Sequence, residues 1–309
     1  GLGDPVNRVG KRIKIRGVLR DALREKSVGL IEEIPEKGIK KYGKPVGIIG
    51  SLIPTTNPEL TPVTTAIYAI KARDVVIYSP HPRSKNTSDE VIRLMREALE
   101  SLGAPADILQ SLPKVSKAMT HELMARADLV MATGGQDMVK AAYSSGTPAY
   151  GVGKGNSKMI IDETADVKQA AHNSMLSKTK DFGSGCSADG NLIIHESIFD
   201  DVVKQLEEEG AYIASDEERE LIRPVVWDEE GHRLPDTVAV SPQQLAETAG
   251  FSIPEDRKFI AVMSDGVGKG KVFADEKLTT LMTLHKYEGE FENAIKVAEG
   301  VFANGGIGH

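Results

Sequence analysis

The residue best suited to chemistry is Cys186, the one cysteine among 309 residues. It lies in the segment 180–187 (KDFGSGCS), where small residues flank it on both sides. A lone thiol forms no internal disulfide, and neighbouring glycines let another molecule approach the backbone closely. Such a thiol is either a nucleophile that meets a substrate or an incidental loop cysteine, because reactivity requires thiolate character.

Three further loops follow apolar runs that are expected to be strands. They are 54–58 (PTTNP), 79–82 (SPHP) and 133–136 (TGGQ). Parallel strands end at one edge of a sheet, so we expect these loops to share that edge and to form a nucleotide cleft. None is the GxGxxG fingerprint, and 151–156 (GVGKGN) fails the P-loop spacing.

The elements that must position these loops alternate between apolar runs and helical stretches. The pattern predicts strands at 46–53, 75–78, 108–109, 129–132 and 149–152, with helices following Asn57 and over 88–102, 116–126 and 136–144. Asn57 is expected to be an N-cap, with Pro58 at the first helical position. Strands alternating with helices predict an α/β fold with a doubly wound, mostly parallel sheet.

A second αβ region follows residue 157. Helices are expected at 166–177, 199–209 and 291–301, and strands at 192–194 and 259–263. The polar stretch 215–258 is read as solvated helix and loop. We therefore predict two domains, 1–157 and 158–309, with Cys186 in the second.

Composition narrows the classes of function. The net charge is −7 and the sequence pI is about 5.6, which argues against nucleic-acid binding. No apolar run spans a membrane, no signal peptide is found, and a single cysteine favours a reducing compartment, so we expect a cytoplasmic protein. The seven histidines show no ligand spacing, and no metal site is proposed.

Many of these segments together resemble the aldehyde dehydrogenase superfamily, specifically its CoA-acylating branch. The chain is similar to sulfoacetaldehyde dehydrogenases and to the aldehyde dehydrogenase half of bifunctional aldehyde–alcohol dehydrogenases. The matching segments occur in family order, and the string from 133 to 156 is highly specific. They are 54–58, 79–83, 133–135, 138–146, 151–156, 161–166, 177–179, 276–278 and 305–309.

The resemblance implies roles for individual residues. Cys186 matches the nucleophile that adds to the aldehyde carbonyl, and Asn57 matches the amide that stabilises the oxyanion. The matches to the NAD or NADP site are Thr133 and Gly134 beside the cofactor, Ser79, His81 and Pro82 at the adenosine end, and Glu276 at the nicotinamide ribose. The implied fold is a Rossmann-type doubly wound cofactor domain plus an αβ catalytic domain.

The same resemblance separates two chemical branches. Hydrolytic members carry a glutamate in the loop matching 151–156, which activates water against the thioester. Here the loop has no acid, so we expect coenzyme A to resolve the thioester and release acyl-CoA. A base from elsewhere, for example Glu163, is the alternative that leads to a carboxylate product.

The chain departs from the acylating pattern near the nucleophile, where Lys180 and Phe182 replace an aromatic residue and an asparagine. We expect an altered acyl pocket, in which Lys180 either accepts an anionic aldehyde such as sulfoacetaldehyde or points to solvent. His309 matches a histidine near the active site. The amino-terminal start and the carboxy-terminal segment of the family, which pairs subunits, are missing, and a homo-oligomer is expected of the full-length form.

Three other readings stay open at this point. The first is a hydrolytic dehydrogenase, and the second is a semialdehyde reductase that forms an acyl phosphate. The third is a non-catalytic nucleotide-binding or assembly fragment. The 151–156 loop argues against the first, and the CoA-type segments argue against the first two.

Overall fold

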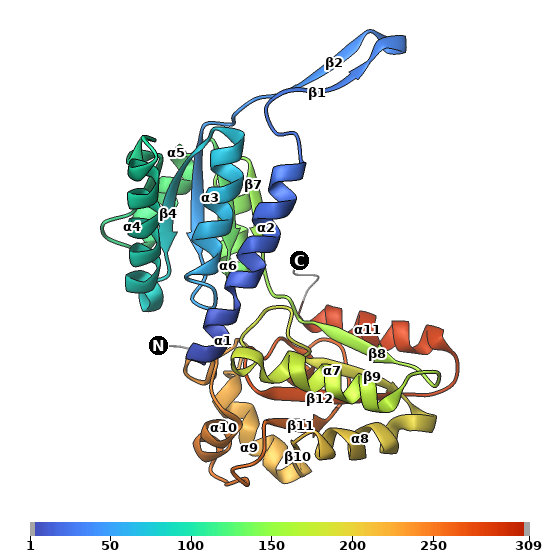
Figure 1. Cartoon of the computed structure of the whole chain (residues 1–309). Coiled ribbons are helices and arrows are strands. Elements are labelled where there is room, and N and C mark those ends of the chain that lie inside the picture. The colour runs from blue at the N-terminus through green and yellow to red at the C-terminus, as the bar shows by residue number, and fades with distance from the viewer. Residues whose placement is uncertain (1–3, 306–309) are drawn as a thin grey trace. The chain divides into compact units, whose positions relative to one another are not determined.

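The computed structural model describes residues 4–305, which form two compact units (Figure 1). One unit is Val9–Gly153. The other joins the described part of Gly1–Arg8 to that of Lys154–His309, so the chain passes between the units twice. Among the described residues no helix is long and apolar enough to cross a membrane.

The unit Val9–Gly153 is built on a five-stranded parallel sheet with the strand order β5-β4-β3-β6-β7. The strands are β3 (Ile48–Ile53), β4 (Val75–Pro80), β5 (Leu109–Ser111), β6 (Leu129–Thr133) and β7 (Ala149–Val152). The chain winds outward from β3 through β4 to β5, and then returns to β6 on the other side. This confirms the predicted Rossmann-type doubly wound sheet.

Helices cover both faces of this sheet, as the alternation of side chains along β3 requires. Ile49 and Ile53 pack on one face with α3 (Leu60–Ala72) and α4 (Lys85–Ser101). Leu52 packs on the other face with α5 (Lys117–Arg126) and α6 (Gln136–Tyr143). A Cβ on Gly50 would lie 3.2 Å from atoms of Leu123 and Ala127, so the glycine permits the close approach of α5.

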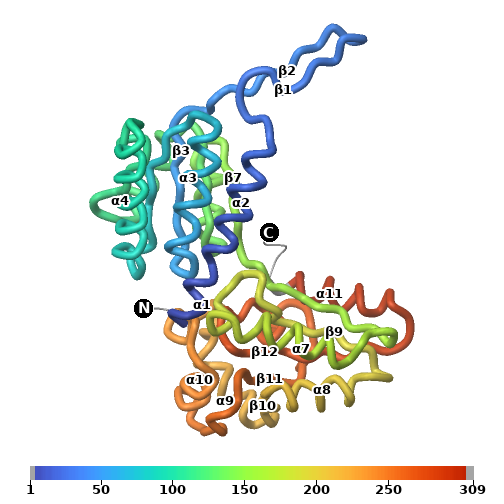
Figure 2. Tube along the Cα trace, in the orientation of Figure 1, coloured from blue at the N-terminus to red at the C-terminus, as the bar shows by residue number. Residues whose placement is uncertain are grey.

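An antiparallel hairpin in the same unit lies outside the parallel sheet. Its strands are β1 (Gly29–Ile34) and β2 (Ile39–Gly43), which follow α2 (Arg12–Arg24). The Cα trace shows the hairpin extending away from the helices of its own unit (Figure 2). Leu30, Ile39 and Tyr42 are exposed on it, so no core specifies its position. The sequence analysis did not predict this hairpin.

The second unit also holds a five-stranded parallel sheet, with the order β10-β11-β12-β9-β8. The strands are β8 (Lys158–Ile161), β9 (Asn191–His195), β10 (Ala211–Ile213), β11 (Phe259–Met263) and β12 (Leu281–Tyr287). Helices α7 (Val167–Thr179) and α8 (Phe199–Glu208) pack on one face. Helices α9 (Asp216–Val226), α10 (Pro242–Ala249) and α11 (Phe291–Gly305) pack on the other. The expected αβ catalytic fold is confirmed.

The expectation that 215–258 is solvated was wrong. Ile222, Val226, Trp227 and Leu245 are buried there and pack against the sheet. Each such apolar side chain contributes about 1.5–3 kcal/mol when it leaves water. The acidic residues occupy the outer face of α9, where Ser215 and Glu218 form a capping box.

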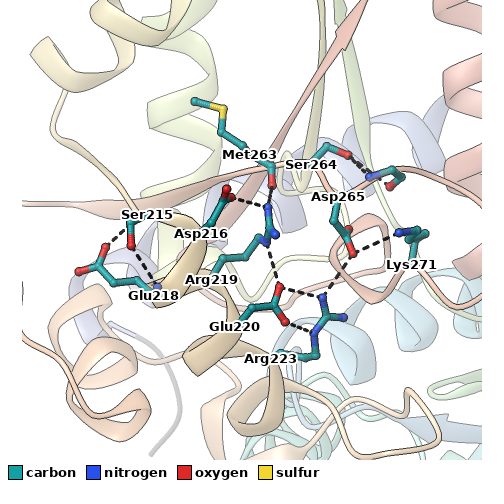
Figure 3. Close-up of polar contacts among 11 residues, drawn as sticks. Ser215, Asp216, Glu218, Arg219, Glu220, Arg223, Met263, Ser264, Asp265 and Lys271 are labelled. Carbon is teal, nitrogen blue, oxygen red and sulfur yellow. Dashed lines mark hydrogen bonds and ion pairs between the residues drawn. The ribbon is translucent and has the colours of Figure 1, made fainter.

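Ion pairs fasten α9 to the end of β11 (Figure 3). Arg219 donates to the backbone oxygen of Met263 at 3.2 Å and pairs with Asp216 at 2.8 Å. Arg223 contacts Glu220 at 2.8 Å and Asp265 at 3.3 Å. The helix packs on the sheet through buried Ile222 and Val226, and the contacts of Arg219 and Arg223 with Met263 and Asp265 join its charged face to the strand end.

Candidate active site

The three loops predicted to share an edge do so. Residues 54–58 follow β3, residues 81–84 follow β4 and residues 134–135 follow β6, and these three strands are parallel neighbours. The direction of winding changes between β3 and β6. Ligands of doubly wound sheets bind at such a switch point, beyond the carboxyl ends of the strands. Asn57 and Gly134 therefore flank the expected ligand position of this unit.

Asn57 is held by an ammonium group from α2's amino-terminal flank. Lys11, which is 7% exposed, donates from Nζ to Asn57 Oδ1 at 2.8 Å and to the backbone oxygen of Thr56 at 3.3 Å. The Nζ atom also lies 3.6 Å from Glu59 Oε1. With its oxygen bound in this way, the Asn57 side chain has its NH₂ group as the end that can donate to a ligand.

The predicted helix start after Asn57 was wrong by two residues. Helix α3 begins at Leu60, and Glu59 holds the N-cap position. The Asn57 side-chain oxygen accepts from Lys11 and makes no capping bond to the first turn, although the Asn57 backbone oxygen accepts from Thr61 N at 3.1 Å. Asn57 therefore stays in the loop at the strand edge.

The residues that follow β4 form a compact turn. Ser79 is buried at the strand end, and its Oγ lies 2.9 Å from Thr120 Oγ1. His81 Nδ1 accepts from Arg83 N at 3.2 Å, and Pro82 begins a short 3₁₀ helix. Burial, and then the charge of Arg83, lower the pKa of His81, so its ring is neutral at pH 7.

Thr133 and Gly134 lead directly into α6. Thr133 is the last residue of β6, and Gly134 N donates to the backbone oxygen of Val152 at 3.1 Å. Gly135 is the N-cap of α6, so the first backbone N–H groups of that helix face the same edge. Such a terminus attracts anionic groups.

In the second unit the chemistry-bearing residues lie at the opposite, amino-terminal edge of the sheet. Residues 154–157 precede β8, residues 180–190 precede β9 and residues 264–280 precede β12. Because β8, β9 and β12 are adjacent and parallel, these three segments meet at one edge. Cys186 and Glu276 come from two of them.

Cys186 is half-buried in a turn closed by Ala188 N donating to the Gly185 backbone oxygen at 2.9 Å. The turn follows the segment Lys180–Gly183, which continues from the carboxyl end of α7 and has left-handed backbone at Asp181 and Phe182. Lys180 is exposed, and Phe182 is half-buried. The two predicted pocket residues thus differ in their exposure to solvent.

Glu276 is fixed by the loop that carries no acid. Gly155 N donates to Glu276 Oε1 at 2.7 Å. Lys154 Nζ lies 2.5 Å from Asp275 Oδ2, and Asp275 Oδ1 accepts from Glu276 N at 2.7 Å. Burial raises the pKa of Glu276, because the interior disfavours the charged carboxylate.

A buried amide network beneath this edge was not found by sequence reasoning. Asn191 Nδ2 donates to Asn156 Oδ1 at 2.9 Å, and Asn191 Oδ1 accepts from Lys277 Nζ at 2.9 Å. His285 Nε2 lies 3.1 Å from the same Oδ1. Burial lowers the pKa of Lys277 well below its usual range and that of His285 to about 3. The one signal in the sequence is Asn191, a polar residue that opens the apolar strand β9.

One predicted residue is not brought to this edge. Glu163, the alternative base, is exposed just after β8, which is the carboxyl edge and thus the end of the sheet opposite Cys186. His309 lies outside the described residues. Asn57 and Cys186 belong to different units.

One possible metal-binding group occurs among residues 4–305. Asp228, Glu230 and His232 offer ligand atoms within 4.8 Å of one another. Their closeness follows from a tight turn, in which His232 N donates to Asp228 Oδ1 at 2.7 Å and Glu230 and His232 stay exposed. The turn lies far along the chain from the site residues.

Comparisons with known proteins agree on one family. The family model described as "Aldehyde dehydrogenase family" matches residues 13–239. A sulfoacetaldehyde dehydrogenase from an Acholeplasma species is 42% identical over 314 residues, which cover 100% of this chain and 64% of that relative. The chain therefore spans about two thirds of that protein's length.

Solved structures give the same result. An acetylating aldehyde dehydrogenase from Geobacillus thermoglucosidasius superposes with a TM-score of 0.94 at 36% identity, covering 100% of this chain and 69% of that one. A propionaldehyde dehydrogenase from Rhodopseudomonas palustris, solved with bound CoA and an acylated cysteine, gives a TM-score of 0.76 at 30% identity. That match covers 84% of this chain and 59% of the other.

Proposed function

Because this chain belongs to the aldehyde dehydrogenase family, we propose that it is the part of a CoA-acylating aldehyde dehydrogenase that binds the cofactor and carries the nucleophile. The proposed reaction oxidises an aldehyde to an acyl-CoA with NAD⁺ or NADP⁺. The observation that carries this proposal is the 154–156 loop, which lies at the same sheet edge as the Cys186 turn and offers no carboxylate. Without a base there, water attack on a thioester is slow.

The proposed steps use this chain's residues as follows. The Cys186 thiolate adds to the aldehyde carbon, and the carbonyl oxygen becomes an oxyanion that accepts from the Cys186 backbone N–H and the Asn57 NH₂ group. Loss of hydride from that carbon gives a thioester on Cys186. A CoA thiolate then attacks the thioester carbon, and the Cys186 thiolate leaves.

The nicotinamide cofactor supplies the hydride acceptor when it is bound. Support for a dinucleotide site comes from the switch point between β3 and β6 and from the N-terminus of α6, which suits a pyrophosphate. In this proposal Thr133 and Gly134 lie beside the cofactor, and Ser79, His81 and Pro82 contact its adenosine end. Glu276 accepts from the nicotinamide ribose, and its bond to Gly155 N aims it.

The roles of the two domains follow the same division. We assign cofactor binding to the amino-terminal domain, predicted as 1–157, and the nucleophile to the domain predicted as 158–309. The compact units divide after Gly153, within the 151–156 segment. A homo-oligomeric full-length form and a cytoplasmic location stay predictions.

We further propose that the aldehyde is a small anionic one. Lys180 is an exposed cation six residues before the nucleophile, and it forms no ion pair with any of residues 4–305, unlike Lys154. An unpaired ammonium beside a reacting centre binds a sulfonate or carboxylate group at the far end of a short aldehyde. Phe182, which is half-buried, covers the apolar part of the same pocket.

The test is NADH formation from acetaldehyde, propionaldehyde, sulfoacetaldehyde and succinate semialdehyde, with and without CoA. The proposal expects turnover that depends on CoA and is faster with the two anionic aldehydes. Equal rates without CoA would mean that water resolves the thioester, and the acylating assignment would be wrong.

Lys180→Ala should lower the ratio of kcat/KM for sulfoacetaldehyde over acetaldehyde, and Lys168→Ala, on the exposed start of α7, is the matched control. An unchanged ratio would refute the role of Lys180.

A further inference from the structure

The backbone just before Cys186 adopts a conformation that its residues disfavour. Asp181, Phe182 and Gly183 have φ values of 54°, 51° and 65°, so three consecutive residues are left-handed. Left-handed backbone is costly for L-residues, above all for a bulky one such as Phe182, and it persists only where the surroundings enforce it. Something must therefore hold this turn.

Part of the restraint is steric. A Cβ placed on Gly183 would lie 2.4 Å from the backbone oxygen of Thr279 and 3.0 Å from that of Lys178. The turn is thus wedged between the end of α7 and the segment leading into β12. This packing fixes where Gly183 sits, but it does not by itself fix Asp181 and Phe182.

The rest of the restraint comes from the amino-terminal end of the chain. Asp181 is 3% exposed, and three groups among the described residues lie at its carboxylate. Asp4 N donates to Oδ1 at 3.0 Å, Arg8 Nε lies 3.1 Å from Oδ1, and Ser184 Oγ donates to Oδ2 at 3.0 Å. Asp4 and Arg8 are 177 and 173 residues away in sequence and belong to the same compact unit as Cys186.

We propose that Asp181 is a positioning residue for Cys186, and that Arg8 of α1 (Pro5–Gly10) is the cation that holds Asp181 in place. The proposal rests on the proposed role of Cys186 as nucleophile. Asp181 links the amino-terminal segment to Ser184, which is fully buried and two residues before Cys186. The contacts of Asp181 with Arg8 and Ser184 thereby fix the direction of the Cys186 backbone N–H and of its thiol.

Charge and burial both favour this arrangement over an incidental contact. A carboxylate that is almost fully buried needs a cation and hydrogen-bond donors, and Arg8 supplies the cation with a side chain that is 16% exposed. Without Arg8 the carboxylate would still accept from Asp4 N and Ser184 Oγ, but the cation that lies 3.1 Å from Oδ1 would be gone. The left-handed turn would then be free to relax, and the thiol would lose its alignment.

The experiment measures acylation of Cys186 without cofactor or CoA. p-Nitrophenyl acetate is mixed with the full chain in a stopped-flow instrument from pH 6 to pH 9, and the burst of p-nitrophenolate is recorded. The thiolate adds to the ester carbonyl, p-nitrophenolate leaves, and an acetyl thioester remains on the sulfur. Cys186→Ser defines the background rate.

The proposal expects Arg8→Gln and Asp181→Asn to lower the plateau acylation rate about tenfold, because misalignment of a reacting group by a fraction of an ångström has effects of this order. Arg8→Lys should restore most of the rate. Arg12→Gln, a change of an exposed arginine four residues further on, should leave it unchanged. A purely structural role would lower the thermal midpoint of Arg8→Gln but leave the plateau rate of the folded protein intact.

The outcomes separate the two levels of the argument. A wild-type chain that shows no burst above Cys186→Ser would overturn the proposed nucleophile itself. A normal wild-type burst, with wild-type plateau rates in folded Arg8→Gln and Asp181→Asn, would overturn only the positioning role. Should Asp181→Asn fail to fold, the pair Arg8→Gln and Arg8→Lys still decides the matter.

Discussion

Lys178 carries an amine into the interior of the second unit, and its removal should stabilise that unit. The residue is 1% exposed near the end of α7. Burial lowers its pKa to about 7, with the charges of Asp189 and Glu276 opposing the effect. In the unfolded chain the same amine keeps a pKa near 10.5. Folding therefore disfavours the ammonium form.

The magnitude follows from these two pKa values. A difference of about 3.5 corresponds to at most about 5 kcal/mol, which the protonated lysine costs the folded state below pH 7. Above pH 7 the folded amine is neutral while the unfolded amine still binds a proton, so the cost shrinks with each pH unit. We expect Lys178→Met to raise the free energy of unfolding at pH 6, and the advantage to shrink by about 2–3 kcal/mol between pH 7 and pH 9.

Urea unfolding followed by the fluorescence of Trp227 measures this effect. Trp227 is the one tryptophan of the chain and is 1% exposed in the core of the same unit, so the signal reports on the unit that contains Lys178. Lys204→Met, on the exposed side of α8, is the matched control. The double variant Lys178→Met/Asp189→Asn removes the contribution of the carboxyl group that Lys178 leaves behind. A stability difference that is the same at pH 6, 7.5 and 9 would refute the reasoning.

Three further changes test the site. Glu276→Gln should raise the free energy of unfolding by about 1 kcal/mol at pH 8 and less at pH 5. The reason is that the raised pKa of Glu276 stabilises the folded state at low pH, and this contribution is lost as the pH rises through the pKa of the folded state. Urea midpoints at both pH values check this. Weaker NADH binding should accompany the change. Lys154→Met leaves Asp275, which is 2% exposed, without its cation and should cost about 1–3 kcal/mol, whereas Lys154→Arg should cost less. Gly183→Ala should lower stability by more than about 2 kcal/mol, because φ is 65° and a Cβ meets a backbone oxygen at 2.4 Å. Gly185→Ala, whose Cβ meets nothing closer than 3.9 Å, should lower stability by under about 1 kcal/mol. Thermal melts of both glycine variants measure this difference.

Much of the first unit could be predicted because its strands are continuous apolar runs with clear helix signals between them. The strand β12 was missed although it lies at the centre of its sheet. Its sequence contains Thr283, His285 and Lys286, which break the apolar pattern. The structure accommodates them because Thr283 Oγ1 donates to the Phe273 backbone oxygen at 2.6 Å and His285 contacts Asn191. Such partners become visible only in three dimensions.

At the candidate site, too, the hydrogen bonds that hold the segments together could not be predicted from the sequence. Family motifs pointed to Cys186 and Glu276 at single positions, and both lie in segments that meet at one sheet edge. What holds these segments could not be read from the sequence, since Asn156 and Asn191 are 35 residues apart and Asp4 and Asp181 are 177 apart. Hydrogen bonds over such separations leave no periodic trace. The roles of the individual site residues stay predictions.

The division of the chain has a consequence for the order of folding during synthesis. Val9–Gly153 is continuous, so it can fold as soon as it has left the ribosome, whereas Asp4 and Arg8 must wait for Asp181. At roughly 5–20 residues per second, that delay is about 10–35 s. During this time Asp181 has not yet been synthesised, so Asp4 and Arg8 cannot make their contacts with it. The turn that contains Cys186 is thus completed late, and a chain stalled before residue 181 would expose the folded first unit without this turn.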